Sequence, residues 1–150
     1  MKRPHIQTGP IVRTRAMERH RMKHTKAQIV ECDFCHFSHS NDQVIKEYKY
    51  FWLVKNIFPY AVWDACRVTD HEMLSPKRHV TSISQFTPEE GKEYLDIISK
   101  AESSGYAVYS RPDGSAGKSV AHQHTHFISI DNKRIKTMYY NFAPHILWFK

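Results

Sequence analysis

Three histidines stand at alternate positions in the last third of the chain: His122, His124 and His126. In an extended strand, residues i, i+2 and i+4 point to the same face, so this spacing predicts three imidazoles on one surface. Imidazole acts near neutral pH as a nucleophile, as a general acid or base, and as a metal ligand. The triplet therefore indicates a catalytic or metal site, with an ordinary polar strand face as the alternative.

A Cys-x-x-Cys pair at Cys32 and Cys35 offers a second chemistry. Because His36 follows it directly, the pair also matches the signature of c-type haem attachment. A redox-active dithiol is another interpretation of the pair. Half of a zinc site is the interpretation that we favour. Zinc takes four nitrogen or sulfur ligands in a tetrahedron, so two more must come from elsewhere. They could be supplied locally by His36 or His39, or over a long range by His79 and His122.

Two further segments carry polar groups near these motifs. His71 begins a stretch that runs on to the sequence Pro-Lys-Arg-His and ends at His79. Lys118 and Ser119 follow a glycine and lead straight into the histidine triplet. Glycine, lysine and serine suit phosphate, but the full P-loop pattern is absent, and we expect no Walker-type site.

The elements that must position these residues are a sheet and a helix. β-branched and aromatic residues predict strands over 48–58, 106–111 and 120–130. Thr87 can cap a helix, Pro88 suits its first position, and Glu90 completes a capping box. Apolar residues at helical spacing follow, so the sequence predicts a helix over Pro88–Ser103. The pattern predicts an α+β fold, with a mostly antiparallel sheet of about five strands and one main helix.

Charge divides the chain into two parts. Among its 150 residues the formal charge is +7. Residues 1–27 hold eight basic residues against Glu18 alone, so the remainder sums to zero. We therefore expect a basic N-terminal arm over 1–27 and one domain over 28–150. No apolar stretch predicts a secretory signal or a membrane span, three cysteines cannot form a disulfide framework, and a cytoplasmic location follows as an expectation.

The order of the motifs is more specific than any one of them. Cys-x-x-Cys, then Pro-Lys-Arg-His, then the Thr-Pro-Glu-Glu helix start, then Ala-Gly-Lys-Ser-Val-x-His-x-His-x-His-Phe-Ile resembles the histidine triad (HIT) superfamily. The resemblance covers about residues 30–130 and is greatest to the zinc-containing branch. It implies a HIT-like fold, a nucleotide substrate and a homodimer.

The resemblance also implies roles for individual residues. His124 would be the nucleophile that attacks the α-phosphorus of a nucleoside phosphoramidate or dinucleoside polyphosphate, and water would hydrolyse the nucleotidyl-histidine intermediate. His126 and Ser119 would stabilise the developing charge, and His71 would orient the triad. One structural zinc ion per chain would be held by Cys32, Cys35, His79 and His122.

For the nucleotide, the resemblance implies a pocket beside Phe51, Asn56 and Phe58, with Asp64 near the ribose. Lys118 and Arg111 stand where the family usually has uncharged amides. Both changes add positive charge, which predicts a preference for a more anionic substrate such as a dinucleoside polyphosphate.

Two other functions compete with a hydrolase. One is a zinc-stabilised module that binds nucleic acid or protein through residues 1–27, whose binding to nucleic acid would depend strongly on salt. The other is a nucleotidyl transferase or phosphorylase. Those branches usually carry glutamine at the third triad position, so His126 favours hydrolysis.

Overall fold

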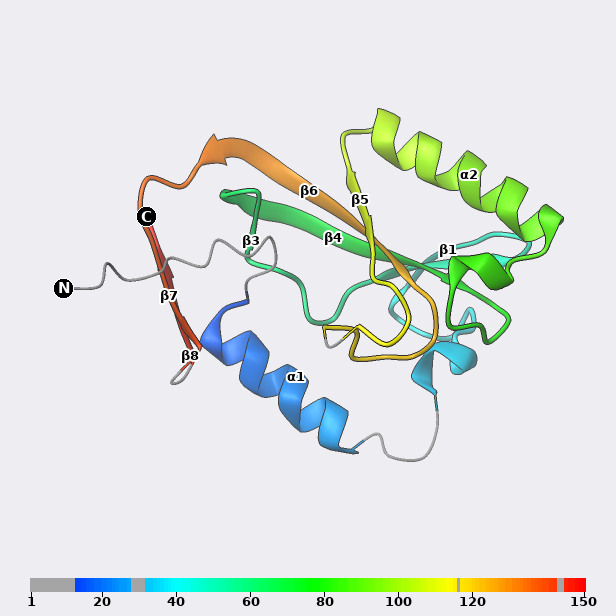
Figure 1. The fold of residues 1–150 in the computed structure, drawn as a ribbon, viewed down its shortest axis with the longest axis horizontal. Coiled ribbons are helices and arrows are strands. Elements are labelled where there is room, and N and C mark those ends of the chain that lie inside the picture. The colour runs from blue at the N-terminus through cyan, green and yellow to red at the C-terminus, as the bar shows by residue number, and fades with distance from the viewer. Residues whose placement is uncertain (1–12, 28–31, 116, 143–144) are drawn as a thin grey trace.

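The computed structural model describes residues 13–27, 32–115, 117–142 and 145–150, and their arrangement is shown in Figure 1. The predicted α+β class is confirmed. The helices are α1 (Arg15–Ala27) and α2 (Pro88–Ser103), with two 3-10 turns, η1 (Asp33–His36) and η2 (Ile83–Gln85). The strands are β1 (Val44–Glu47), β2 (Phe51–Lys55), β3 (Val62–Trp63), β4 (Cys66–Pro76), β5 (Ala107–Ser110), β6 (Thr125–Arg134), β7 (Met138–Phe142) and β8 (His145–Phe149).

Antiparallel pairing joins every strand of the main sheet, in the order β1-β2-β4-β6-β5, and β3 pairs with β4. Within the described residues this sheet has six strands, against the five or so predicted. The extra strand, β3, is only two residues long and turns back into β4 through Asp64 and Ala65, which have φ values of 48° and 59°. A strand this short leaves no alternation in the sequence to detect.

Two of the predicted strands have bounds that differ from the prediction. The predicted 48–58 strand reduces to β2, because Lys49 and Tyr50 form a bend whose backbone amides donate to the Glu93 carboxylate. The predicted 120–130 strand is shifted along the chain, because β6 begins only at Thr125 and continues to Arg134. The histidine triplet therefore does not lie on one strand, and only His126 has a place in the sheet. By contrast, β5 falls within the predicted 106–111 segment.

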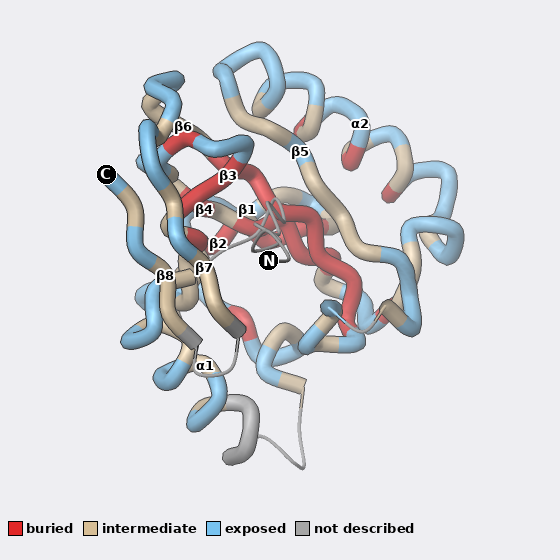
Figure 2. Tube along the Cα trace, turned by 60° about the vertical axis from the view of Figure 1, so that its left-hand side comes forward, coloured by how far each residue is buried: buried red, intermediate tan, exposed pale blue. Residues whose placement is uncertain are grey.

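Helix α2 has the predicted bounds and the predicted cap. The hydroxyl of Thr87 accepts from the Glu90 amide, and the Glu90 carboxylate accepts from the Thr87 amide. The buried face of α2 packs on one side of the sheet, where the core is continuous through the central strands (Figure 2). This cluster consists of Phe51, Leu74, Tyr94, Ile97 and Phe127.

The other side of the sheet carries the candidate chemistry. Successive side chains of a strand point to opposite faces of the sheet. The residues next in sequence to those packed under α2 therefore lie on the face away from α2. Val54, Met73, His126 and Tyr109 are register partners in one row across β2, β4, β6 and β5. His71 is two residues before Met73 on β4 and shares its face.

Helix α1 gives the basic segment a defined structure from residue 15 to residue 27, whereas residues 1–12 lie outside the described part of the chain. This second helix adds to the single main helix that we predicted. It packs against the domain: the Arg13 Nε, just before it, donates to the Phe58 carbonyl across 2.9 Å, and the rings of His20 and His24 contact the Phe58 ring edge-on. Helix α1 also contacts β8, which pairs with β7 in a separate two-stranded sheet.

In the described residues, no helix is both long and apolar enough to cross a membrane.

Candidate active site and metal centre

His124 is held in one tautomer. Its Nδ1 lies 2.8 Å from the carbonyl oxygen of His122, which can only accept a hydrogen bond. Nδ1 must therefore carry the proton, and Nε2 keeps a lone pair. The residue is 7% exposed and lines a cavity, and a lone pair on a neutral imidazole can act as a nucleophile.

A chain of hydrogen bonds sets the tautomer of His126. The backbone amide of Tyr60 donates to Nδ1 of His71 across 3.0 Å, so the remaining proton of a neutral His71 is on Nε2. In this tautomer His71 Nε2 donates to Nδ1 of His126 across 2.9 Å, and the same Nε2 lies 3.1 Å from the side-chain nitrogen of Asn56. His126 in turn carries its proton on Nε2, as a donor within 4.9 Å, ring to ring, of His124.

Burial keeps these imidazoles neutral. It lowers the pKa of His71 to about 3, with a further contribution from the nearby positive charge of Arg13. The pKa of His126 is well below its ordinary value, again mainly through burial, and the pKa of His124 is lowered for the same reason. Neutral rings are what the hydrogen-bond chain requires, because a protonated imidazole has no lone pair to accept with.

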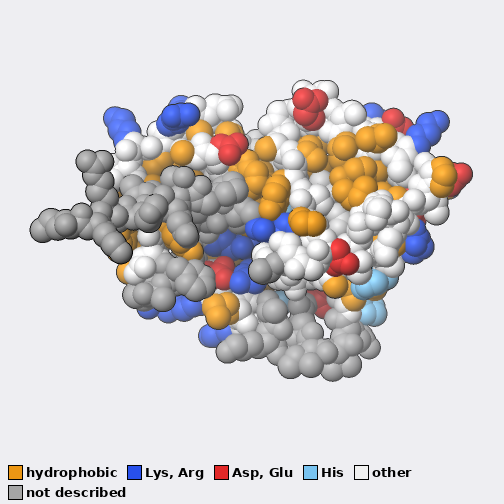
Figure 3. Space-filling model, in the orientation of Figure 1, with side chains coloured by type: hydrophobic (Ala, Val, Ile, Leu, Met, Phe, Trp, Pro, Cys, Tyr) orange, Lys and Arg blue, Asp and Glu red, His pale blue; other side chains and the backbone are white. Residues whose placement is uncertain are grey.

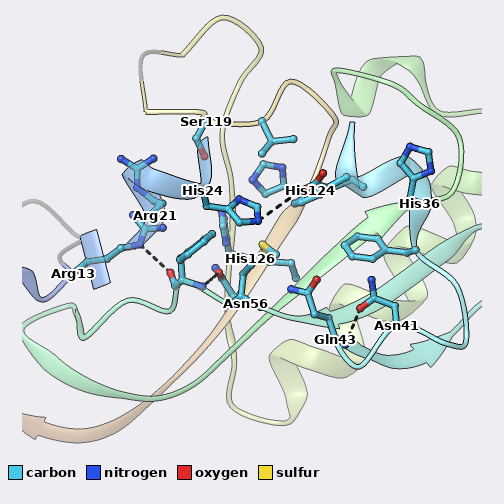
Figure 4. Close-up of a pocket in the computed structure, with 17 residues that line it drawn as sticks. Arg13, Arg21, His24, His36, Asn41, Gln43, Asn56, Ser119, His124 and His126 are labelled. Atoms are coloured by element: carbon cyan, nitrogen blue, oxygen red, sulfur yellow. Dashed lines mark hydrogen bonds and ion pairs between the residues drawn. The ribbon is translucent and has the colours of Figure 1, made fainter. Parts of the chain in front are cut away.

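A cavity of about 280 Å³ opens beside His124 and His126. Its size suits a small molecule or part of one. Side chains from α1, η1, the end of β2, β4 and the 117–124 loop converge on it (Figure 4). Besides these two histidines, the lining includes Arg13, Arg21, His24, Asp33, Phe34, His36, Phe37, Asn41, Gln43, Asn56, Ile57, Phe58, Met73, Ser119 and Val120.

Next to this cavity, two cysteines and two histidines form a candidate metal centre. The ligand atoms of Cys32, Cys35, His79 and His122 all lie within 4.8 Å of one another. Cys35 Sγ is 3.1 Å from His79 Nδ1, and both sulfurs are 3.5 Å from His122 Nδ1. The structure thus brings together the four residues of the long-range zinc prediction, although 44 to 90 residues separate each cysteine from its histidine partners.

The donor set fits zinc. His122 Nε2 donates to the Pro76 carbonyl across 2.9 Å, so Nδ1 keeps a lone pair directed at the sulfurs. A carbonyl that fixes the tautomer of a ligating histidine is a usual companion of zinc sites. Four ligands, two of them sulfur, form a closed structural site. The alternative local ligands lie elsewhere: His39 pairs with Glu47, and His36 lines the cavity.

The other predicted site residues are only partly brought together. Ser119, Asn56 and Phe58 line the cavity. Phe51 is fully buried under α2, because its place on β2 directs it to the face opposite His126. Asp64 is exposed in the turn between β3 and β4 and does not line the cavity.

Lys118 and Arg111, the two basic residues that we predicted to contact the phosphate groups, lie in different surroundings. Lys118 Nζ donates to the Thr81 carbonyl and to Gln123 Oε1, and neither Lys118 nor Arg111 lines the cavity. The Arg111 guanidinium lies 5.3 Å from the centre of the Tyr109 ring, which stacks on His126. Its charge is near enough to lower the pKa of both His124 and His126.

Sequence reasoning missed the contribution of α1. Arg13, Arg21 and His24 line the cavity, although they lie in the segment that we predicted to be an arm separate from the domain. The available signal was the three- and four-residue spacing of His20, Arg21 and His24, which places them on adjoining faces of a helix. It is weak because this helix has few apolar residues.

No family model matches the chain, and no curated protein is a significant match. Solved structures do match it. A HIT family hydrolase from Legionella pneumophila Philadelphia 1 is 20% identical, with a TM-score of 0.51 over 71% of this chain and 96% of that one. A HIT family hydrolase from Clostridium thermocellum is 19% identical, with a TM-score of 0.51 over 73% and 100%. A Zn-bound histidine triad family protein from Mycobacterium smegmatis is 19% identical, with a TM-score of 0.50 over 71% and 84%.

At sequence identities this low, the similarity to these structures establishes the fold of the chain and nothing more. The chain has the HIT-like fold, which confirms what the order of its motifs predicted. The matched part covers nearly the whole length of the Legionella and Clostridium proteins, so the fold is present as a complete unit.

Proposed function

We propose that the chain is a nucleotide hydrolase that cleaves a bond at the α-phosphorus through a nucleotidyl-histidine intermediate. The observation that carries the proposal is the bond from His124 Nδ1 to the His122 carbonyl, because it leaves Nε2 as a lone pair at the cavity. The fold shared with HIT family hydrolases supports it.

In the first step the Nε2 lone pair forms a bond to phosphorus, and the bond from phosphorus to the leaving group breaks. The Ser119 hydroxyl lines the cavity and is the group that we assign to give the leaving atom a proton. In the second step water attacks phosphorus and gives a proton to the Ser119 oxygen that was deprotonated in the first step, the nitrogen–phosphorus bond breaks, and neutral His124 returns. Covalent catalysis of this kind divides one difficult displacement into two easier ones.

His126 supplies charge stabilisation in both steps. Its proton on Nε2 is fixed by the chain from Tyr60 through His71, so it donates to a phosphoryl oxygen without first rotating or titrating. A donor that is already oriented in a buried site stabilises developing negative charge more than a solvated one. His71 is a positioning residue in this scheme.

Zinc, when bound by Cys32, Cys35, His79 and His122, would supply a structural cross-link. The cluster joins the segment around η1 to the end of β4 and to the first triad histidine. Because the carbonyl that orients His124 belongs to His122, holding His122 in place also holds the nucleophile. We propose one ion per chain.

Substitution of His124 by alanine tests this function. We expect turnover of adenosine 5′-phosphoramidate and of diadenosine tetraphosphate to fall by about 1,000-fold or more, as when a covalent nucleophile is removed. His39→Ala is the matched control, because His39 is a surface histidine paired with Glu47. Retained turnover in His124→Ala would refute the mechanism, and product formation that requires added phosphate would indicate a phosphorylase.

A homodimer belongs to the same proposal. The edge strand β5 has a free side in the described part of the sheet, and hydrophobic side chains gather between β5 and α2 (Figure 3). Val108 on β5 is 37% exposed and Leu95 on α2 is 60% exposed. Open edges of this kind pair readily with another chain. Light scattering of the purified protein checks this, and a monomer at micromolar concentration would contradict it.

The nucleic-acid role of residues 1–27 and the cytoplasmic location stay predictions. The packing of α1 against the cavity favours a role for this segment at the small-molecule site.

A further inference from the structure

Helix α1 forms one wall of the candidate active site. Arg13, Arg21 and His24 from this segment line the same cavity as His124 and His126 (Figure 4). His24 Nε2 lies 3.9 Å from a carboxylate oxygen of Asp33 on η1, and the His24 ring contacts Phe58. The helix is thus joined to the domain on two sides of the cavity.

Arg13 brings positive charge close to the triad. Its guanidinium lies 4.5 Å from the centre of the Tyr60 ring, and that ring is 5.6 Å from the His126 ring. The bond to the Phe58 carbonyl fixes the side chain in this position. A charged group here is within reach of an anion bound at His126.

Arg21 continues the positive charge along the helix. Its guanidinium pairs with Glu18, which also lies 4.0 Å from Arg13. Glu18 itself does not line the cavity. Among the described residues of the lining, Asp33 is the one carboxylate, and the two guanidinium groups outnumber it.

We propose that Arg13 and Arg21 form an anion subsite, contributed by the α1 segment, for the phosphate groups of the substrate beyond the α-phosphate. The inference rests on the proposed function and deepens it by naming the substrate class, a nucleotide joined to a polyphosphate chain. Guanidinium groups bind phosphate through paired, charge-assisted hydrogen bonds. The subsite replaces Lys118 as the source of the polyphosphate preference, because Lys118 does not line the cavity, whereas Arg13 and Arg21 do.

Turnover of two substrates by the full chain tests the subsite. The measurement is the ratio of kcat/KM for diadenosine tetraphosphate to kcat/KM for adenosine 5′-phosphoramidate, whose leaving group has no phosphate. We expect Arg21→Gln to lower this ratio about tenfold, the loss of one charge-assisted contact. Arg19→Gln, on the same helix, removes the same charge from an exposed side chain outside the cavity and should keep the ratio within about twofold of the wild-type value.

Binding separates a failure of the subsite from a failure of the proposed chemistry. In the His124→Ala chain, Arg21→Gln should weaken binding of diadenosine tetraphosphate about tenfold more than binding of AMP, and Arg21→Lys should give an intermediate loss. An unchanged ratio in both assays, or an equal effect of Arg19→Gln, overturns the subsite. Arg21-dependent binding without turnover by the wild-type chain upholds the subsite and refutes the hydrolase. Thermal unfolding shows whether each variant is folded.

Discussion

Nε2 of His71 lies 2.9 Å from Nδ1 of His126, and both rings are at least 96% buried. The backbone amide of Tyr60 sets the direction of this bond from the other side of His71. The Asn56 side-chain nitrogen also lies 3.1 Å from His71 Nε2. With Nδ1 of His71 accepting from Tyr60, Nε2 donates to Nδ1 of His126, and the proton of His126 is on its Nε2. The neighbouring His124 has the opposite arrangement, with its lone pair at the cavity. A hydrogen-bond donor beside a lone pair is the arrangement that the proposed transfer of a nucleotidyl group to nitrogen requires.

Replacing His71 by asparagine tests this arrangement. We expect kcat to fall about fivefold while KM changes little, because His126 loses the donor that fixes its tautomer and about 1 kcal/mol of hydrogen bonding. Steady-state kinetics on adenosine 5′-phosphoramidate checks it. Glutamine places an amide donor nearer to His126, so His71→Gln should recover part of kcat. An equal kcat in all three proteins would contradict a positioning role.

The same residue predicts a pH dependence of stability. The pKa of His71 is about 3 in the folded chain and near 6.5 when unfolded, so between these values the unfolded chain holds more protons. The free energy of unfolding should therefore rise with pH across this window and lose the contribution of His71 as pH falls below 6.5. From pH 7 to pH 5 this loss is at most about 2 kcal/mol.

Urea unfolding at pH 5 and pH 7 measures this loss in the free energy of unfolding. His71→Gln should lose less stability than the wild-type chain over this interval, because the other buried histidines contribute equally to both proteins. Identical losses in the two proteins would show that His71 is not neutral by burial.

The sequence predicted those elements whose ends are determined by residues within the element itself. The cap and the bounds of α2 followed from Thr87, Pro88 and Glu90, which act within one turn. The start of β6 at Thr125 could not be predicted, because β propensity does not show where strand pairing begins. The prediction that Phe51 lies at the nucleotide was wrong for a similar reason. The face of the sheet on which a strand residue lies depends on the register of β2 against β4, which the sequence of β2 alone does not show.

Part of the candidate site could be predicted from the sequence, and part of it could not. Motif order placed the metal ligands, since Cys32, Cys35, His79 and His122 meet in the structure. The wall formed by α1 could not be predicted from pattern alone, because its contacts with the domain are made by arginine and histidine side chains that usually face solvent. A helix with so few apolar residues has no broad apolar face from which its packing could be predicted.

Metal analysis tests the zinc centre. We expect about one zinc ion per wild-type chain, and His79→Ala should lose the metal together with part of the stability, since structural zinc contributes folding free energy. Inductively coupled plasma mass spectrometry and thermal unfolding measure the two effects. His36→Ala is the matched control and should keep the metal. If His36→Ala loses zinc while His79→Ala keeps it, the ligands are local and the assignment is wrong.

The helix cap gives a test of the fold that is independent of function. Thr87→Ala should lower the free energy of unfolding by about 1 kcal/mol, because the Glu90 amide loses its side-chain acceptor. Ser103→Ala, at the exposed end of the same helix, should change it by less than about 0.5 kcal/mol. Chemical denaturation compares them, and equal effects would contradict the capping role.

The most direct test of the account is to identify the covalent intermediate. The full chain is mixed with excess adenosine 5′-phosphoramidate, quenched under denaturing conditions within one turnover, digested, and its peptides are sequenced by mass spectrometry. We predict one nucleotidyl group on the peptide that contains His124, located on that side chain, and none in His124→Ala. A nucleotidyl group on another residue, or steady turnover by His124→Ala, would contradict the claim that His124 is the nucleophile.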